Sequence, residues 1–347
     1  MTKRRDLPSR RQAAALLGGL LGGLGLAAVA ALPAAAAEGQ LRIAKQFGVV
    51  YLLLNVAEDQ KLIEKHGRAA GLDIKVEYVQ LSGGSAVNDA LLSGSIDVAS
   101  AGIGPLFTLW DRTRGRQGVK GIASLGNFPY YLVTNRPGVA SIADLTDKDR
   151  IAVPAVGVSV QSRILQWASA KLWGDKDFAK LDRISVAVPH PEAAAAIIKG
   201  GTEISAHFAN PPFQEQELAE NPNARIVLRS YDVQGGPASS TVLYGTEAFY
   251  KDSPKTYQAF VDALDEAARF ITANPDRAAD IYLKATGSRT DRDLLLKVIK
   301  NPEVTFKVEP QNTLGLGQFM HRVGAIRNEP KALGDYFFVS PRIAAGS

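Results

Sequence analysis

The fold is indicated most clearly by the stretch AVNDALLSGSIDVASAGIGP, residues 86–105. Its first part, 86–92, has helical spacing, and Gly94 is expected to end that helix. Residues 96–99 then predict a short strand, and the glycines that follow predict a turn into a second helix. Strands that alternate with helices in this way are typical of βαβ units and of a mainly parallel sheet.

The same alternation continues on both sides of this stretch. Before it, strands are predicted at 41–44 and 74–79, with a single helix over 51–66 between them. After it, we predict strands at 150–153, 184–188 and 204–208, and helices after Gly157 and at 191–199, 255–272, 276–286 and 313–326. This order of elements predicts an α/β protein.

Two apolar segments, 130–135 and 239–245, differ from the other strands because Gly and Pro breakers bound them. We expect them to carry the chain between two parts of the molecule. The prediction is an α/β fold with two doubly wound lobes joined by two hinge strands. Lobe 1 comprises 38–135 and 239–347, and the inserted lobe 2 comprises 136–238. Such a fold suits the capture of a small ligand between the lobes.

The net charge is concentrated at the N-terminus of the 347-residue chain. The whole chain has a formal net charge of +5, of which residues 1–37 contribute +4. The nearly neutral remainder lacks the basic face that nucleic acid requires. The absence of cysteine excludes a disulfide framework, a thiolate metal site and a Cys nucleophile.

Residues 1–37 have the pattern of a secretory signal peptide. A basic start precedes an apolar segment rich in Ala, Leu and Gly, and small residues predict cleavage near Ala37. Ser9-Arg10-Arg11 also fits a twin-arginine signal, so both export routes stay open. A single membrane anchor is the alternative, because about 20 apolar residues can span a bilayer. We expect an exported, soluble protein.

Motifs of known enzymes do not match this chain. Residues 157–161 resemble a nucleophile elbow, but Gln161 stands where that motif needs a second glycine. No Gly-Lys pair occurs, which excludes a P-loop, and the four histidines lack metal-ligand spacing. The main hypothesis is a receptor without catalytic activity, cofactor or metal. An exported hydrolase is the alternative.

Several short motifs occur together in a characteristic order. They are ALLSGSIDVA at 90–99, IADL at 142–145, Phe260 with Ala263-Leu264, Asn274-Pro275, VTF at 304–306, Phe319-Met320 and GAI at 324–326. In this order the chain resembles the substrate-binding proteins of nitrate/taurine/alkanesulfonate-type ABC importers. The resemblance implies a type II periplasmic binding protein fold, a periplasmic location, and an inner-membrane permease with its ATPase as partners. We expect a monomer.

The candidate ligand-binding residues come from loops at the predicted carboxyl ends of strands, where doubly wound sheets bind ligands. Four loops contribute Gln46, Phe47, Gly48 and Tyr51; Gly84 and Ser85; Gly102 and Ile103; and Gly157, Val158 and Ser159. Further candidates are Tyr130, His207, Phe208 and Asn210. For each residue, local packing or a plain turn is the alternative. Whether Arg163, His190 and Glu192 face the cleft stays open.

The expected ligand is a small anionic organic solute. Ser159 and the free N–H groups at a helix start favour an anion. Aromatic candidates such as Phe47, Tyr51 and Tyr130 favour an organic solute over a bare inorganic ion. The family resemblance implies a sulfonate, such as taurine or an alkanesulfonate. An aromatic carboxylate, nitrate or bicarbonate, and a pyrimidine or other heterocycle are alternatives.

Overall fold

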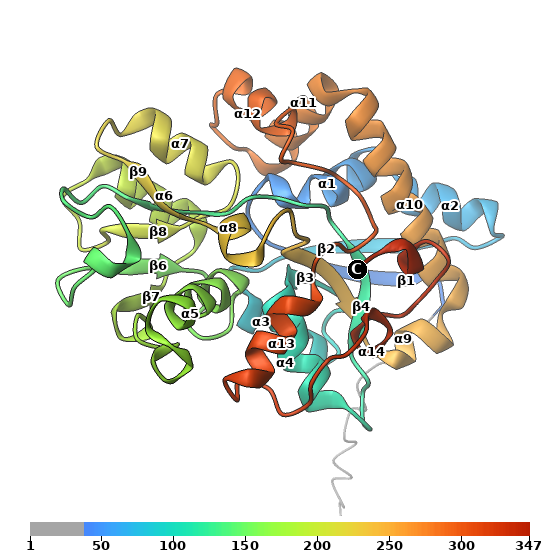
Figure 1. The fold of residues 1–347 in the computed structure, drawn as a ribbon. Helices are drawn as coiled ribbons and strands as arrows, with labels where there is room; N and C mark the ends of the chain where they lie inside the picture. The colour runs from blue at the N-terminus through green and yellow to red at the C-terminus, as the bar shows by residue number, and fades with distance from the viewer. Residues whose placement is uncertain (1–37) are drawn as a thin grey trace, which may run out of the picture. The chain divides into compact units, whose positions relative to one another are not determined.

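The computed structural model describes residues 38–347, in which two five-stranded sheets organise the chain (Figure 1). The predicted signal peptide and its cleavage site lie outside the described residues. Within 38–347, no helix is long and apolar enough to cross a membrane.

The first sheet has the strand order β2-β1-β3-β10-β4. β1 pairs in parallel with β2 and β3, whereas β10 is antiparallel to β3 and β4. The strands are β1 Gln40–Lys45, β2 Lys75–Gln80, β3 Val98–Gly102, β4 Lys120–Ser124 and β10 Thr241–Gly245.

The second sheet has the order β7-β6-β8-β5-β9 and repeats this arrangement. β6 is parallel to β7 and β8, whereas β5 is antiparallel to β8 and β9. The strands are β5 Tyr131–Thr134, β6 Ile151–Val153, β7 Ser185–Ala187, β8 Ala206–Phe208 and β9 Arg225–Arg229.

The two segments expected to cross between parts of the molecule, β5 and β10, occupy equivalent places in the two sheets. Each is antiparallel to both of its neighbours. The expectation of mainly parallel sheets is therefore corrected to two mixed sheets. Consecutive strands that pair in parallel must be joined by a long crossover connection. A strand that enters from the other sheet is not joined to its neighbours in this way, so it can pair with them antiparallel.

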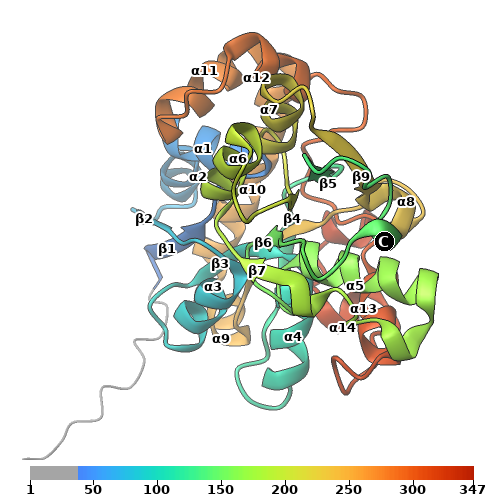
Figure 2. The same ribbon diagram turned by 90° about the vertical axis from the view of Figure 1, so that its left-hand side faces the viewer.

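Helices cover both faces of the second sheet, with α6 and α7 on one side and α5 on the other (Figures 1 and 2).

The helices up to residue 234 are α1 Leu52–Asp59, α2 Leu62–Ala69, α3 Gly84–Leu92, α4 Ile103–Thr113, α5 Val160–Trp173, α6 His190–Lys199, α7 Phe213–Glu220 and α8 Ser230–Gln234. Those after it are α9 Glu247–Asp252, α10 Pro254–Ala273, α11 Pro275–Thr286, α12 Arg292–Ile299, α13 Leu314–Arg322 and α14 Leu333–Tyr336. Short 3₁₀ turns lie at Val49–Tyr51, Ile142–Asp144, Asp175–Asp177, Asp182–Ile184 and Ile343–Ala345.

Some expectations about the elements were wrong. The single helix expected over 51–66 is two helices, because Lys61 between them has a left-handed backbone with φ of 51° that an α-helix cannot contain. The strand expected at 96–99 is shifted to 98–102. The pattern also missed α7, whose residues FQEQELAE contain no apolar stripe from which a buried face could be recognised.

The segments that lead into β5 and β10 are joined by hydrogen bonds. Ser239 Oγ donates to Asn127 Oδ1 at 2.8 Å, and Asn127 Nδ2 donates to Gln311 Oε1 at 2.7 Å. The Tyr130 hydroxyl bonds to Thr241 Oγ1. The two crossings therefore lie side by side, and a C-terminal segment is bound to both.

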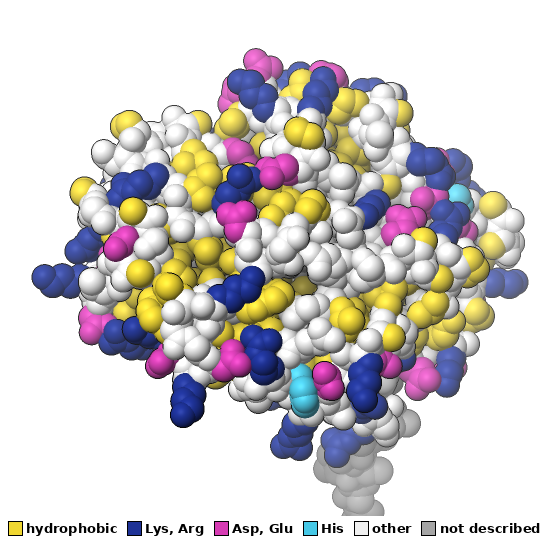
Figure 3. Space-filling model, viewed as in Figure 1, with side chains coloured by type: hydrophobic (Ala, Val, Ile, Leu, Met, Phe, Trp, Pro, Cys, Tyr) yellow, Lys and Arg dark blue, Asp and Glu magenta, His cyan; other side chains and the backbone are white. Residues whose placement is uncertain are grey.

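Charged side chains of both signs are interspersed on the face of the molecule seen in Figure 3, without a continuous basic region. This agrees with the nearly neutral charge of the chain after residue 37.

Asp97, within the motif at 90–99, ties β3 to β1. Its carboxylate accepts hydrogen bonds from Arg42 N at 2.8 Å, Nε at 3.0 Å and Nη2 at 2.7 Å, and the residue is 6% exposed. Asp97 thus satisfies a backbone donor at the sheet and pairs with the Arg42 guanidinium.

We predict that Asp97→Ala lowers the free energy of unfolding by about 2–3 kcal/mol, since hydrogen bonds to a charged group are lost and Arg42 loses its partner. Chemical denaturation would measure the change. The control is Asp89→Ala, at an exposed position of α3. Equal effects of the two substitutions would contradict the prediction.

Candidate functional site

A small cavity of about 20 Å³, here called the inner cavity, lies where loops of both sheets meet. From the side of the first sheet it is lined by Gln46, Phe47, Tyr51, Gly84, Gly102, Pro105 and Thr241. From the crossing and the second sheet it is lined by Tyr130, Pro154, Ser159, Val160, Gln161, His190 and Asn210. Its volume suffices for about one water molecule.

Four helices begin at the wall of the inner cavity. Gly84 opens α3, Gly102 is the N-cap of α4, Ser159 is the N-cap of α5 and His190 opens α6. The first N–H groups of a helix have no partner within it, and the helix dipole places partial positive charge there. Among the described residues that line this cavity there is no Lys or Arg. An anion here would be stabilised by dipoles and neutral donors.

The inner cavity is closed by direct contacts between the loops 46–49 and 210–211. Val49 N donates to Pro211 O at 3.0 Å, and Asn210 Nδ2 donates to Phe47 O at 3.2 Å. Asn210 Oδ1 is buried, and no hydrogen bond to it is found within 38–347. This oxygen could accept a hydrogen bond from a ligand.

Glycine allows the backbone of the two sides to approach closely at position 102. A Cβ atom on Gly102 would lie 2.6 Å from the Cβ of Val160, at the start of α5. Any larger residue at 102 would therefore push against α5.

A chain of buried hydrogen bonds leads away from the inner cavity. Gln161 Nε2 lies 3.1 Å from His190 Nε2, and His190 Nδ1 lies 2.7 Å from His207 Nε2. His207 Nδ1 in turn contacts Glu217 Oε1. Gln161 and His190 line the cavity, whereas His207 and Glu217 are fully buried.

Burial determines the charge state of this chain of residues. It lowers the pKa of His207 to about 3, lowers the pKa of His190 well below its usual value and raises the pKa of Glu217 well above its usual value. The pair of His207 and Glu217 is therefore neutral, because ionising either group would place a charge in a fully buried site. The carboxylic acid proton of Glu217 can then be donated to His207 Nδ1.

The neutral state also sets the direction of the remaining hydrogen bonds. His207 Nε2–H donates to His190 Nδ1, and His190 Nε2–H points at the Gln161 amide. The amide oxygen is the matching acceptor, and it exchanges places with the nitrogen by a half-turn of the amide.

Most of the residues expected to bind a ligand lie together at this site. Those that line the inner cavity are Gln46, Phe47, Tyr51, Gly84, Gly102, Tyr130, Ser159 and Asn210. The hydroxyl of Ser159 is already engaged, since it donates to Ala155 O at 2.9 Å and accepts from Ser162 N at 3.3 Å. Its hydroxyl acts as an N-cap, which was the alternative interpretation.

Six candidates line neither this cavity nor the larger one described below: Ser85, Ile103, Gly157, Val158, His207 and Phe208. Ser85 is exposed in the first turn of α3, and Ile103 and Phe208 are buried in the core. His207 lies behind His190. Of the three residues left open, His190 lines the cavity, and Arg163 and Glu192 do not.

The sequence interpretation missed Gln161 and Thr241 as residues that line the cavity. Gln161 lies in the fourth candidate loop, where the sequence marks it only as a departure from a nucleophile elbow. Thr241 lies in a predicted hinge strand. A candidate list that ran one turn into each helix would have included Gln161.

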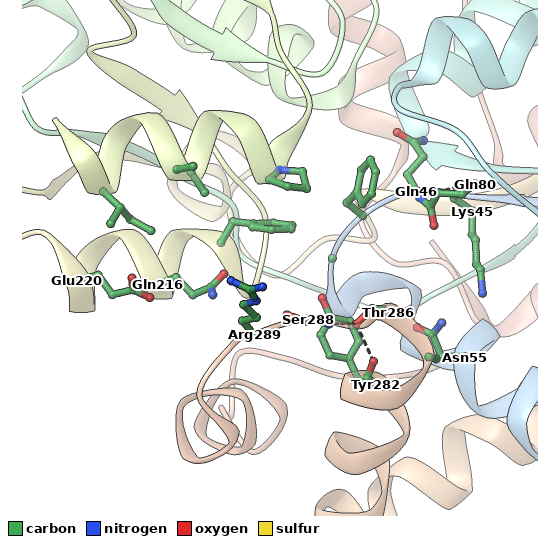
Figure 4. Close-up of a pocket in the computed structure, with 18 residues that line it drawn as sticks. Lys45, Gln46, Asn55, Gln80, Gln216, Glu220, Tyr282, Thr286, Ser288 and Arg289 are labelled. Atoms are coloured by element: carbon green, nitrogen blue, oxygen red, sulfur yellow. Dashed lines mark hydrogen bonds between the residues drawn. The ribbon is translucent and has the colours of Figure 1, made fainter. Parts of the chain in front are cut away.

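A larger cavity of about 720 Å³, here called the outer cavity, shares Gln46 and Phe47 with the inner cavity (Figure 4). Gly48, another expected ligand residue, lines it. The other residues that line it are Lys45, Asn55, Gln80, Pro191, Ala194, Ala195, Ile198, Phe213, Gln216, Glu220, Tyr282, Ala285, Thr286, Ser288 and Arg289.

Two mixed sheets linked by antiparallel crossing strands, with a polar cavity between their loops, define a periplasmic binding protein fold. Solved structures agree. The alkanesulfonate-binding protein SsuA from Xanthomonas axonopodis pv. citri, bound to MOPS, matches with a TM-score of 0.67 at 18% identity, covering 88% of this chain and 100% of its own. A protein from Bordetella bronchiseptica RB50 matches with a TM-score of 0.69 at 23% identity, covering 89% and 96%.

The periplasmic nitrate-binding protein NrtA from Synechocystis PCC 6803 matches with a TM-score of 0.64 at 15% identity, covering 86% of this chain and 84% of its own. The NMT1/THI5 like family matches residues 68–278, so the chain belongs to this family. No curated protein matches the chain in sequence. The resemblance to this group of binding proteins, inferred from the sequence, is confirmed.

We predict that Glu217→Gln becomes more stable relative to the wild type as the pH rises from 5 to 7. The folded wild type keeps the Glu217 proton in this range and the unfolded chain releases it, so the contribution of Glu217 to wild-type stability falls as pH rises. The buried histidines contribute equally to the wild type and the variant. The variant lacks this proton, so its free energy of unfolding relative to that of the wild type should grow by about 1.4 kcal/mol per pH unit. Urea denaturation at several pH values measures it.

The matched control is Glu220→Gln, at an exposed position of the same helix. Its stability relative to the wild type should not vary with pH in this way. A pH-independent difference for Glu217→Gln would show that the acid is ionised in the folded protein.

Proposed function

We propose that this protein is the substrate-binding receptor of an ABC importer and binds a small anionic organic solute between two lobes. The lobes are those predicted from the sequence, 38–135 with 239–347, and 136–238, except that β5 pairs within the second sheet and so belongs with the second lobe. The receptor works in the periplasm after removal of residues 1–37. It delivers the solute to a membrane permease and its ATPase and has no catalytic role of its own.

The observation that carries this proposal is the convergence of four helix N-termini from both sheets on one cavity. A ligand anion held there contacts both sides at once, and it would therefore favour the closed arrangement over an open one. Gln161 adds a neutral donor, because an amide whose oxygen accepts from His190 presents its NH2 group to the cavity.

The small volume of the inner cavity supports a hinge mechanism. A solute with a sulfonate or carboxylate head cannot enter a space of about 20 Å³ while loops 46–49 and 210–211 are hydrogen-bonded. The lobes separate about the crossings near Asn127 and Ser239, the solute binds, and the lobes close on it. The permease then recognises the closed form.

The first choice of ligand is a sulfonate such as taurine or an alkanesulfonate. SsuA from Xanthomonas is an alkanesulfonate-binding protein and NrtA is a nitrate-binding protein. Aromatic residues at the inner cavity, Phe47, Tyr51 and Tyr130, favour an organic solute over nitrate.

A panel of solutes tests the proposal: taurine, alkanesulfonates, nitrate, bicarbonate, aromatic carboxylates and pyrimidines. A solute at 100 times its Kd should stabilise the protein by about 2.7 kcal/mol, which thermal unfolding detects. Absence of any shift, together with native mass spectrometry that finds no bound solute, would overturn the receptor proposal. Hydrolysis of an ester or amide by the protein would favour the enzyme alternative.

A variant at the cleft provides a second test. We predict that Gly102→Ala weakens binding of the best solute roughly tenfold to a hundredfold, because overpacking against Val160 opposes closure by about 1–3 kcal/mol. Titration calorimetry measures the Kd. Gly334→Ala is the matched control, since its Cβ would meet only Val339, at an ordinary 3.4 Å. Equal affinity of both variants would contradict closure at position 102.

A further inference from the structure

The outer cavity is much larger than a taurine-sized solute needs, and it shares Gln46 and Phe47 with the inner one. Its volume of about 720 Å³ is within the range of sites that hold drug-sized molecules. Gln46 and Phe47 belong to both cavities, so a ligand that enters while loops 46–49 and 210–211 are apart can lie against these two residues and reach both cavities.

We propose that the outer cavity holds the apolar body of the solute, so that the natural ligand is an extended organic anion with an aromatic or long aliphatic body. This inference rests on the proposed function, in which the anionic head is bound at the helix N-termini of the inner cavity. It adds a prediction of the size and the polarity of the ligand's body, the part beyond the anionic head.

One wall of the outer cavity is an apolar stripe of α6. Pro191, Ala194, Ala195 and Ile198 have the spacing i, i+3, i+4, i+7, which places them on one face of the helix. Pro191 and Ala195 are exposed, and Ile198 is partly exposed. The core-facing positions of the same helix include Ala193 and Ile197, both 0% exposed. The stripe on the cavity side is therefore additional apolar surface that a ligand can cover.

Aromatic rings extend this apolar surface from two directions. Phe213, at the start of α7, lines the outer cavity and remains partly exposed. Phe47 lines both cavities. The two alanines of the stripe keep the space between these rings open. Flat aromatic bodies and alkyl chains both bind favourably to such a surface.

The opposite wall is polar. Figure 4 shows Gln46, Lys45 and Asn55 across the cavity from Gln216 and Glu220. Asn55 is 2% exposed, and its Oδ1 has no hydrogen-bond partner among the residues of 38–347. An unpartnered buried oxygen at a cavity wall indicates a ligand donor, such as a hydroxyl or an amine on the body.

The charges around the outer cavity are balanced. Lys45 is paired with Glu58, and Glu220 and Arg289 are both exposed residues that line the cavity. The strongest preference for an anion therefore stays with the inner cavity, and the outer cavity selects by apolar contact and shape.

Paired solutes with the same head and different bodies test the inference. The probes are ethanesulfonate against naphthalene-2-sulfonate, and acetate against 2-naphthoate, with the Kd of each measured by calorimetry. We expect at least one naphthyl probe to bind tenfold or more tightly than its small partner. Each additional apolar group buried against the stripe should strengthen binding.

Ala195→Leu fills the outer cavity from an exposed position and should not disturb the core. It should weaken the naphthyl probe at least tenfold and change the small probe less than twofold. The control is Ala273→Leu, at an exposed alanine near the end of α10 that lines neither cavity. This control should leave both affinities unchanged.

The outcomes separate the inference from the proposed function. Small and naphthyl probes that bind equally well, or an Ala195→Leu variant that binds the naphthyl probe as the wild type does, would overturn the extended ligand and leave the receptor in place. Failure of all four probes and of the whole solute panel would overturn both.

Discussion

The structure depends on the way the chain passes between its two sheets. β5 and β10 each enter a sheet antiparallel to both neighbours, and the segments before them are joined through Asn127 and Ser239. With the crossings held together, the loops that follow β1 and β8 are brought into direct contact. The inner cavity exists because of this connection, since neither sheet alone supplies more than part of its wall.

The electrostatics of the site follow from helix geometry and burial. Strands β3 and β6 are each followed by a helix whose first residues reach the cavity, and such N-termini attract anions without a charged side chain. Behind this wall, Glu217 and His207 are neutral because both are fully buried. The wall of the inner cavity is therefore lined by helix N-termini and neutral side chains.

Some parts of this arrangement could be predicted from sequence pattern. Most strand and helix positions around residues 40–105 and 150–208 follow from apolar periodicity, and the two crossing strands follow from their breakers. α7 could not be predicted in this way, because its buried residues are the polar Gln214 and Glu217, which hydrogen-bond to Tyr131 and His207 outside the helix. Lys61 likewise ends a helical pattern through a backbone conformation that its residue type does not indicate.

For the candidate site, residues from all four loops proposed from the sequence line one of the two cavities, but only some of the individual side chains do. Glycines and a helix N-cap mark a strand-to-helix turn locally, so Gly84, Gly102 and Ser159 were recognisable. Whether a residue such as Phe208 or His207 faces the cavity or the core depends on which side of its sheet is covered. That coverage comes from helices elsewhere in the chain.

By itself the sequence determined the class of fold, the division into alternating elements and the turns that lead from strands into helices. These properties depend on short-range spacing, which a chain carries in its order of residues. Only the tertiary structure decided that Gln161, Thr241 and His190 meet at one small cavity, and that a larger one with an apolar wall opens beside it. The physical reason is that a cavity is formed by the packing of segments far apart in the chain, and no local pattern encodes the distance between them.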